Sequence, residues 1–256
     1  MWRVGLNASR LLAHTKNRMA LMEIKEEIYP NSPLVEVVFE IRFPGEPMVE
    51  CRRHEFYDHV RSDYPRVLVP QIKAEGFPAL EPYRFEKANG SAGIMLAIDK
   101  FVYYARKYPG YKEFKGKFLK LLSEFDKLFH LENLKRTGWR YINIIPFTRE
   151  SGIIPLKRFL NFGLHLPKGI PEQHENLSIT LISKMDDCSV TTKLESIISS
   201  DRSREALLLD FDCAKSKDLL FSKTETYIEE GHGVARNLFE ALITESYRKY
   251  LRGEEI

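Results

Sequence analysis

LVEVVFEIRF, residues 34–43, is the stretch of the sequence that decides its fold class. Every second residue from Val35 to Phe43 is apolar, and the residues between them include two glutamates and an arginine. Because successive side chains of a β-strand point to opposite faces, this alternation predicts a strand with one apolar and one polar face. Pro33 before the stretch and Pro44-Gly45 after it limit the strand.

The residues that follow predict the rest of a first structural unit. Asn89-Gly90 lies between two strand-like runs, and Asn-Gly in that position is a strong hairpin signal. A long run after Pro109-Gly110 has phenylalanines and leucines at helical spacing, with lysines on its other side. The expected elements are a helix over 49–64, a loop or edge strand over 65–82, strands over 83–88 and 93–105, and a helix over 111–130.

The second part of the sequence predicts the same order of elements, although no residue-level repeat is visible. They are a strand over 139–147, a short helix over 156–164, strands over 177–185, 189–199 and 205–213, and a closing helix over 232–251. The sequence therefore predicts an α+β fold of two similar halves, residues 31–134 and 135–256. In this fold an antiparallel sheet has long helices packed on one face. Whether the halves share one sheet or form two is open at this stage.

The composition narrows the class of protein. The chain has 39 basic and 36 acidic residues and a net charge of +3, so no overall field attracts it to nucleic acid or membrane. Its three cysteines are widely spaced without a CxxC pair, which favours reduced thiols in the cytoplasm over disulfides or zinc. No apolar run approaches the roughly 20 residues needed to cross a bilayer. No familiar nucleotide-binding or hydrolase motif is present, and we predict no cofactor.

Residues 1–30 are predicted to be a basic leader outside the two halves. The first 22 residues contain four basic side chains and no acidic one, and their apolar run is too short for a secretory signal. We interpret them as a disordered segment or a loosely attached helix, or as residues upstream of a start at Met19 or Met22.

Four short motifs occur in a fixed order: NSPLVEVVFEIRF at 31–43, YKEF at 111–114, GWRYIN at 138–143 and LLDFD at 208–212. Together with Phe239-Glu240 in the closing helix, they resemble an uncharacterised, sporadically distributed prokaryotic family of proteins of roughly 250 residues. The resemblance covers about residues 31–251, and the family usually has leucine where this chain has Trp139. It implies no particular activity, and the patchy occurrence of the family implies an association with mobile or defence genes.

The polar face of the predicted sheet is the candidate binding surface, because a sheet covered on one side leaves its other face open. Side chains of the first strand on this face form either a solvated surface or a groove facing a ligand. Arg140 lies among apolar residues and needs an acidic partner, since an unpaired buried charge is costly. Glu36, Glu40 or Asp210 could supply it, and anion recognition is the alternative. The candidate ligand-binding residues are Glu36, Glu40, Arg42 and Arg140, with Tyr141 and Asn143 on the opposite face from Arg140.

A metal site is a further hypothesis. Asp210 and Asp212 are two apart on a predicted strand, so they point to the same side and could share a proton or bind Mg²⁺. Glu195 on a neighbouring strand could be a third ligand, whereas the alternative is a solvated face beside Lys193. The seven histidines lack ligand spacing and are expected at the surface, and Gly231-His232-Gly233 is interpreted as a helix entry.

Three hypotheses for function remain open. The first is a binding or interaction module for a protein partner or small ligand, because the scaffold is well patterned and carries no catalytic signature. The second is a nucleic-acid-binding protein, which would use the lysines of the 111–130 helix and Arg248, Lys249 and Arg252. The third is a metal-dependent enzyme using Asp210 and Asp212. A homo-oligomer is compatible with each of them.

Overall fold

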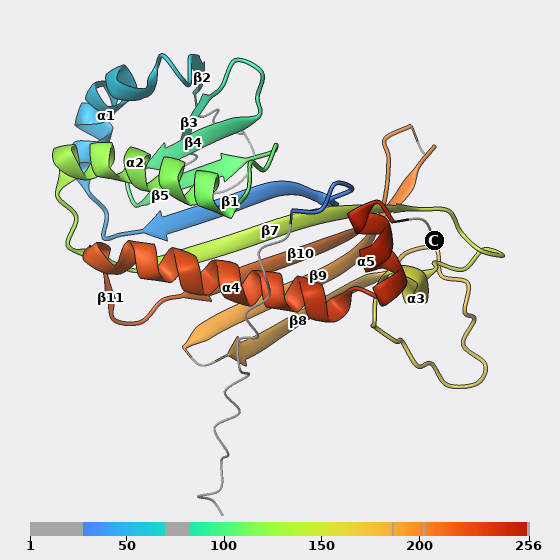
Figure 1. The fold of residues 1–256 in the computed structure, drawn as a ribbon. Coiled ribbons are helices and arrows are strands. Elements are labelled where there is room, and N and C mark those ends of the chain that lie inside the picture. The colour runs from blue at the N-terminus through green and yellow to red at the C-terminus, as the bar shows by residue number, and fades with distance from the viewer. Residues whose placement is uncertain (1–27, 70–81, 186, 202, 255–256) are drawn as a thin grey trace, which may run out of the picture.

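The computed structural model describes residues 28–69, 82–185, 187–201 and 203–254, which fold around one large antiparallel sheet (Figure 1). The strands of the sheet are β1 (Leu34–Arg42), β2 (Arg66–Leu68), β3 (Tyr83–Glu86), β4 (Ala92–Ala97), β5 (Lys100–Ala105), β7 (Arg136–Phe147), β8 (Ser178–Met185), β9 (Cys188–Ile198) and β10 (Glu205–Lys215). Within the described residues these nine strands follow the order β2-β3-β4-β5-β1-β7-β10-β9-β8. The mixed α+β class with an antiparallel sheet is confirmed. Because β1 pairs with β7, the strands on both sides of this pair belong to one sheet and not to two.

The remaining elements are helices and one small ladder. Two short strands, β6 (Asn133–Leu134) and β11 (Leu219–Leu220), pair with each other. The helices are α1 (Pro47–Val60), α2 (Tyr111–Phe129), α3 (Leu156–Phe159), α4 (Thr224–Leu242) and α5 (Glu245–Arg252). No helix in the described part of the chain is both long and apolar enough to span a membrane.

The two faces of the sheet differ as the alternation in β1 predicts. Phe39 is buried and lies opposite Tyr103 on one side and Trp139 on the other. Residues directly opposite each other in a ladder share a face, so these aromatic side chains form one apolar surface. We call it the apolar face, and we call the reverse side, which carries Glu40 and Arg140, the polar face.

The long helices pack against the apolar face. From α2, the ring of Phe118 lies 4.8 Å from that of Phe39, and the ring of Phe114 lies 5.4 Å from that of Trp139. From α4, Gly231 lies so close to β7 that a Cβ atom on it would come 2.7 Å from the Cβ of Trp139. Figure 1 shows α2 and α4 running across the same side of the sheet.

Three predicted elements differ from the structure. The strand expected over 93–105 is two strands, because the chain turns at 98–99, where the carbonyl groups accept hydrogen bonds from Phe43 and Glu46. The closing helix begins earlier and breaks at Thr244, whose hydroxyl accepts from the backbone N–H of Tyr247 and starts α5. The helix expected over 156–164 ends at Phe159, because Leu160 turns to an extended conformation and bridges to Ile243. The predicted basic leader lies almost entirely outside the described residues.

Candidate functional site

The polar face carries a chain of ion pairs centred on Glu40. Its carboxylate accepts from Arg42 Nε at 2.7 Å and from Arg136 Nη1 at 2.5 Å. The same Arg136 reaches Asp212 at 2.8 Å on the neighbouring strand. Burial raises the pKa of Asp212, and the two arginines Arg136 and Arg140 oppose that shift. These charges neutralise one another across β1, β7 and β10.

Arg140 also lies on the polar face, and of the three acidic partners that the sequence left open for it, Asp210 forms the pair. The guanidinium donates from Nε and Nη2 to the two carboxylate oxygens at 2.8 and 2.5 Å, a bidentate pair. The side chain of Asp210 is 8% exposed and that of Arg140 is 47% exposed. Nearby, Glu36 is paired with Arg106 at 3.2 Å. The predicted binding residues of this face are therefore already bound to protein charges.

Tyr141 and Asn143 lie on the apolar face, as their spacing from Arg140 predicts. Asn143 is buried and donates from Nδ2 to the carbonyl oxygen of Leu209 at 3.1 Å. Tyr141 contacts His232 of α4 instead, with 2.7 Å between the phenol oxygen and Nδ1. The sheet itself separates these two residues from Arg140 and Glu40, so the six predicted residues do not form one site.

His232 belongs to a partly buried cluster of rings, which we call the His232 cluster and which the sequence did not indicate. Its ring stacks on that of Tyr111 at 3.8 Å, and Tyr141 links it to the hydroxyl of Tyr108. Burial lowers the pKa of His232 to about 4, with Arg236 acting in the same direction, so the ring is neutral at pH 7. The interpretation of this histidine as part of a helix entry was wrong, because it lies within α4. The adjoining hollow of about 80 Å³ is small for an organic ligand.

The three predicted metal ligands are each held by a basic side chain. Asp210 and Asp212 share the polar face but bind Arg140 and Arg136, respectively. Glu195 accepts from Lys193 at 2.9 Å and from Ser178, and the Lys193 hydrogen bond lowers its pKa. Among the described residues, no three His, Cys, Asp or Glu side chains come together as a metal site.

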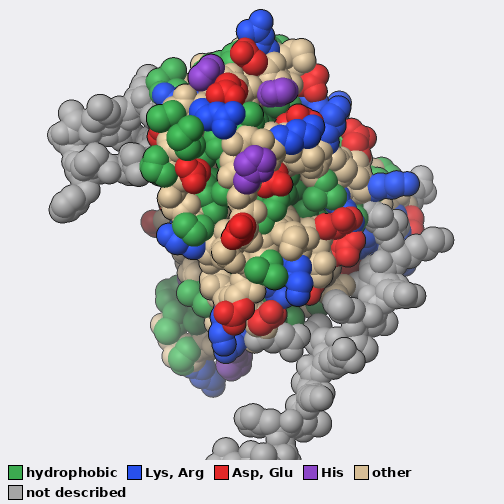
Figure 2. Space-filling view, turned by 90° about the vertical axis from the view of Figure 1, so that its left-hand side faces the viewer, with side chains coloured by type: hydrophobic (Ala, Val, Ile, Leu, Met, Phe, Trp, Pro, Cys, Tyr) green, Lys and Arg blue, Asp and Glu red, His purple; other side chains and the backbone are tan. Residues whose placement is uncertain are grey.

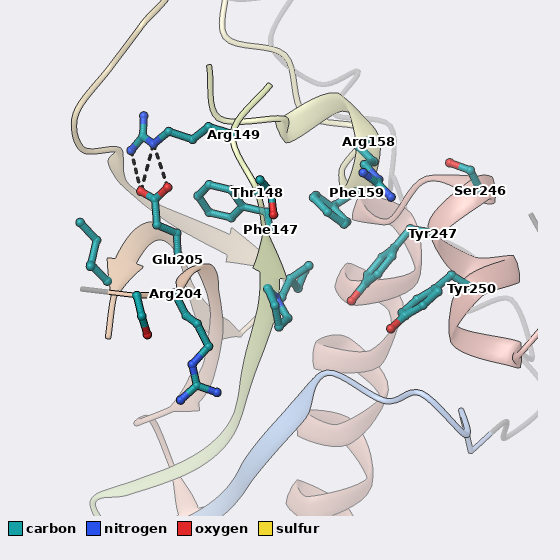
Figure 3. Close-up of a pocket in the computed structure, with 14 residues that line it drawn as sticks. Phe147, Thr148, Arg149, Arg158, Phe159, Arg204, Glu205, Ser246, Tyr247 and Tyr250 are labelled. Atoms are coloured by element: carbon teal, nitrogen blue, oxygen red, sulfur yellow. Dashed lines mark hydrogen bonds and ion pairs between the residues drawn. The ribbon is translucent and has the colours of Figure 1, made fainter. Parts of the chain in front are cut away.

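A hollow of ligand size lies elsewhere, at the end of the sheet where α5 meets β7 and β10. It measures about 830 Å³, within the range typical of small-molecule sites. Tyr247 and Tyr250 stack with their ring centroids 5.9 Å apart, and Phe159 meets Tyr247 edge-on at 5.2 Å. Figure 3 shows both tyrosines projecting from α5 toward β7, with their hydroxyl ends leading. We call this hollow the end cavity, and its lining residues are Ile145, Pro146, Phe147, Thr148, Arg149, Arg158, Phe159, Ile198, Ser203, Arg204, Glu205, Ser246, Tyr247 and Tyr250.

The end cavity is lined by three arginines and one glutamate, a formal excess of two positive charges. Arg149 is used by the protein itself, because it binds Glu205 at 2.8 Å and donates to three backbone carbonyls (Figure 3). The side chain of Arg158 is 68% exposed; its guanidinium has a long 3.8 Å contact with Glu150 and lies 5.6 Å from the ring centroid of Phe159. Arg204 is exposed, and its guanidinium makes no hydrogen bond or ion pair with any described residue. Two cations are thus available to a ligand.

Several basic side chains elsewhere are neutralised by acidic neighbours. Lys115 of α2 binds Glu225 and Glu229 of α4 at 2.7 and 2.5 Å, and Lys117 binds Asp63 at 2.6 Å. Figure 2, which views the end of the molecule formed by α1 and α2, shows basic and acidic side chains interspersed rather than segregated. This arrangement offers no continuous basic track on that end.

The residues of the end cavity were not predicted because no local pattern marks them. Arg158 lies in a four-residue helix, Arg204 precedes β10, and only the fold brings both to α5. The three-residue spacing of Tyr247 and Tyr250 is the one available signal, and it is equally typical of a core-facing helix. Comparison with known proteins adds no guidance, since no family model matches the sequence and no curated protein matches it significantly.

Proposed function

We propose that the protein is a binding module whose site is the end cavity, and that its ligand is a small anion carrying a flat ring. The observation that carries the proposal is the pairing of two available arginines, Arg158 and Arg204, with an aromatic wall in one hollow. Arginine binds phosphate and carboxylate groups through parallel hydrogen bonds, and it also stacks on flat rings. The cavity therefore offers both halves of a recognition site for one molecule.

Each wall of the cavity has a distinct role in this proposal. Tyr250 is 49% exposed and presents a ring face that a ligand can cover. Burial raises the pKa of Tyr247, so its hydroxyl keeps the proton and can donate a hydrogen bond to an anion. Arg149 and Glu205 keep the far wall in place. A mononucleotide has the required combination of ring and charge, and it fits the volume.

The duplicated organisation remains part of the proposal. We infer that residues 31–134 and 135–256 are two similar halves with their helices on one face of the sheet. In support, β1 pairs with β5, the last strand that its half contributes to the nine-stranded sheet, and β7 pairs with β10 in the same way. The three cysteines are unpaired thiols, which supports a reducing compartment such as the cytoplasm.

The two other hypotheses receive less support from the structure. Nucleic-acid binding requires phosphate-contacting cations along a surface, whereas Lys115, Lys117 and Arg248 are bound to acidic neighbours. A metal-dependent enzyme requires Asp210 and Asp212 to exchange their arginine partners for a metal ion. The small-anion proposal needs no such rearrangement.

Titration calorimetry with adenosine and guanosine 5′-monophosphates and triphosphates tests the proposal. Arg204→Ala and Arg158→Ala should each weaken binding about tenfold or more, because a hydrogen bond to a charged group contributes about 1.5–3 kcal/mol. Arg61→Ala, at the exposed end of α1, is the matched control and should bind as the parent does. Adenosine alone and inorganic phosphate alone should bind more weakly than the nucleotide. If no nucleotide binds, or if both arginine variants bind like the parent, the proposal fails.

A further inference from the structure

The outer strand β8 leaves a long sheet edge open. All eight of its residues pair with β9 on one side, and no described residue pairs with its other side. Such an edge presents a row of backbone N–H and C=O groups that can pair with another strand. Ile182 of this strand is 75% exposed, more than any other large apolar side chain among the described residues, and Leu181 is 49% exposed.

β8 also lacks most of the usual devices that keep a sheet edge from pairing. Native edges are protected by short strands, prolines, bulges or several charges. At the opposite edge, β2 has three residues. β8 instead runs without a register shift against β9, has no proline, and carries Lys184 as its one charged residue. The edge is therefore suited to accept a strand.

We propose that β8 pairs antiparallel with β8 of a second copy of this chain, so that two nine-stranded sheets become one continuous sheet. A twofold axis normal to the sheet relates antiparallel neighbours, and residues directly opposite each other then lie on the same face. Placing the axis at Ile182 puts the two copies of this side chain in contact. It also sets Leu181 opposite Ser183, Thr180 opposite Lys184 and Ile179 opposite Met185, so no like charges meet.

A second copy is the occupant because β8 is its own complement in this register. The most exposed apolar side chain meets an identical one, and the lysine meets a threonine. A twofold axis pairs the β8 edge of one chain with the β8 edge of the other, and no β8 edge then remains to bind a third chain. The pairing therefore leads to a dimer and not to a filament. The inference is independent of the ligand proposed for the end cavity.

Size-exclusion chromatography with light scattering tests this inference. The chain should show twice its mass of 29.9 kDa. Ile182→Lys places two like charges on the axis and should give a monomer with an unchanged circular dichroism spectrum. Leu68→Lys on β2 is the matched control at the opposite edge and should remain a dimer. A parent chain that is monomeric at all concentrations, or an Ile182→Lys variant that stays dimeric, overturns the proposal.

Cysteine cross-linking tests the register. In a background with Cys51→Ser, which removes the exposed native thiol, Ile182→Cys should form a disulfide-linked dimer under mild oxidation. Thr180→Cys should not, because its opposite residue is Lys184. Efficient cross-linking by Thr180→Cys and none by Ile182→Cys would refute pairing about this axis.

Discussion

The contact between α4 and β7 at Gly231 predicts that replacing two glycines of α4 by alanine changes the stability of the protein in different ways. Gly231 and Gly233 both lie inside α4, and each loses more conformational entropy on folding than an alanine would. Only the first of them faces the sheet. A Cβ on Gly231 would lie 2.7 Å from the Cβ of Trp139, whereas a Cβ on Gly233 would have no atom within 4 Å.

The magnitude follows from these distances. Non-bonded carbon atoms normally lie about 3.5–4.0 Å apart, so alanine at position 231 would force α4 away from β7 by a substantial part of an ångström. Overpacking of this kind costs about 1–3 kcal/mol. Alanine gains about 1 kcal/mol over glycine in a helix interior, and this gain is common to both positions. Gly231→Ala should therefore be less stable than Gly233→Ala by about 1–3 kcal/mol, and Gly233→Ala should be more stable than the parent.

Urea denaturation followed by circular dichroism measures the free energy of unfolding of both variants. For a chain of this size, the expected difference corresponds to a gap of about 2–12 °C in melting temperature. Gly116→Ala in α2, where a Cβ also has open space, is a second control and should behave like Gly233→Ala. Equal stability of Gly231→Ala and Gly233→Ala would refute the close approach of α4 to Trp139.

Three further predictions test the polar face, the His232 cluster and the thiols. Arg140→Ala should lower the free energy of unfolding by about 1–3 kcal/mol, because it leaves the Asp210 carboxylate without its bidentate partner, and a double-mutant cycle with Asp210→Ala should show that the effect is shared. His232 has a pKa of about 4 in the folded state against 6.5 when unperturbed, so its stabilisation is fully present above pH 6.5 and is lost as the pH falls toward 4; His232→Asn should flatten the dependence of melting temperature on pH in that window. Cys51 should react rapidly with a thiol reagent in the native protein, and the two buried cysteines should react only in denaturant, as counted by absorbance.

The sheet was predictable from the sequence where one face of a strand is buried and the other is charged. In β1, the alternation of Val37, Phe39 and Ile41 with acidic and basic residues sets both the strand and its faces. The turn at 98–99 was missed because neither Gly nor Pro marks it, and apolar runs, 94–97 and 101–104, lie on both sides of it. The break at Thr244 was missed because a capping threonine interrupts an otherwise continuous apolar stripe.

The candidate site was less predictable, because a charge on a strand gives no information about its partner. The side of the sheet for Arg140 follows from the period of two, but its partner Asp210 is 70 residues away and is determined by the pairing of β7 with β10. Arg204 differs because it lies just before β10 begins. The pairing of β10 with β7, which brings the other charged side chains together, does not extend to it. Its availability is a property of the tertiary structure and could not be inferred from its neighbours in sequence.

The end cavity lies at the end of the sheet because helices occupy one face of the sheet and ion pairs occupy the other. The apolar face is covered by α2 and α4 along β1, β5, β7 and β10, which leaves little room between the layers. On the polar face, strands in register place opposite charges side by side, and each ion pair that forms removes a group that could bind a ligand. In the end cavity, cations stay available where a strand ends and a short helix crosses it, as at Arg158 and Arg204. An anion that binds this protein should therefore be sensitive to substitutions at the strand ends and insensitive to Arg42, which lies on the sheet itself.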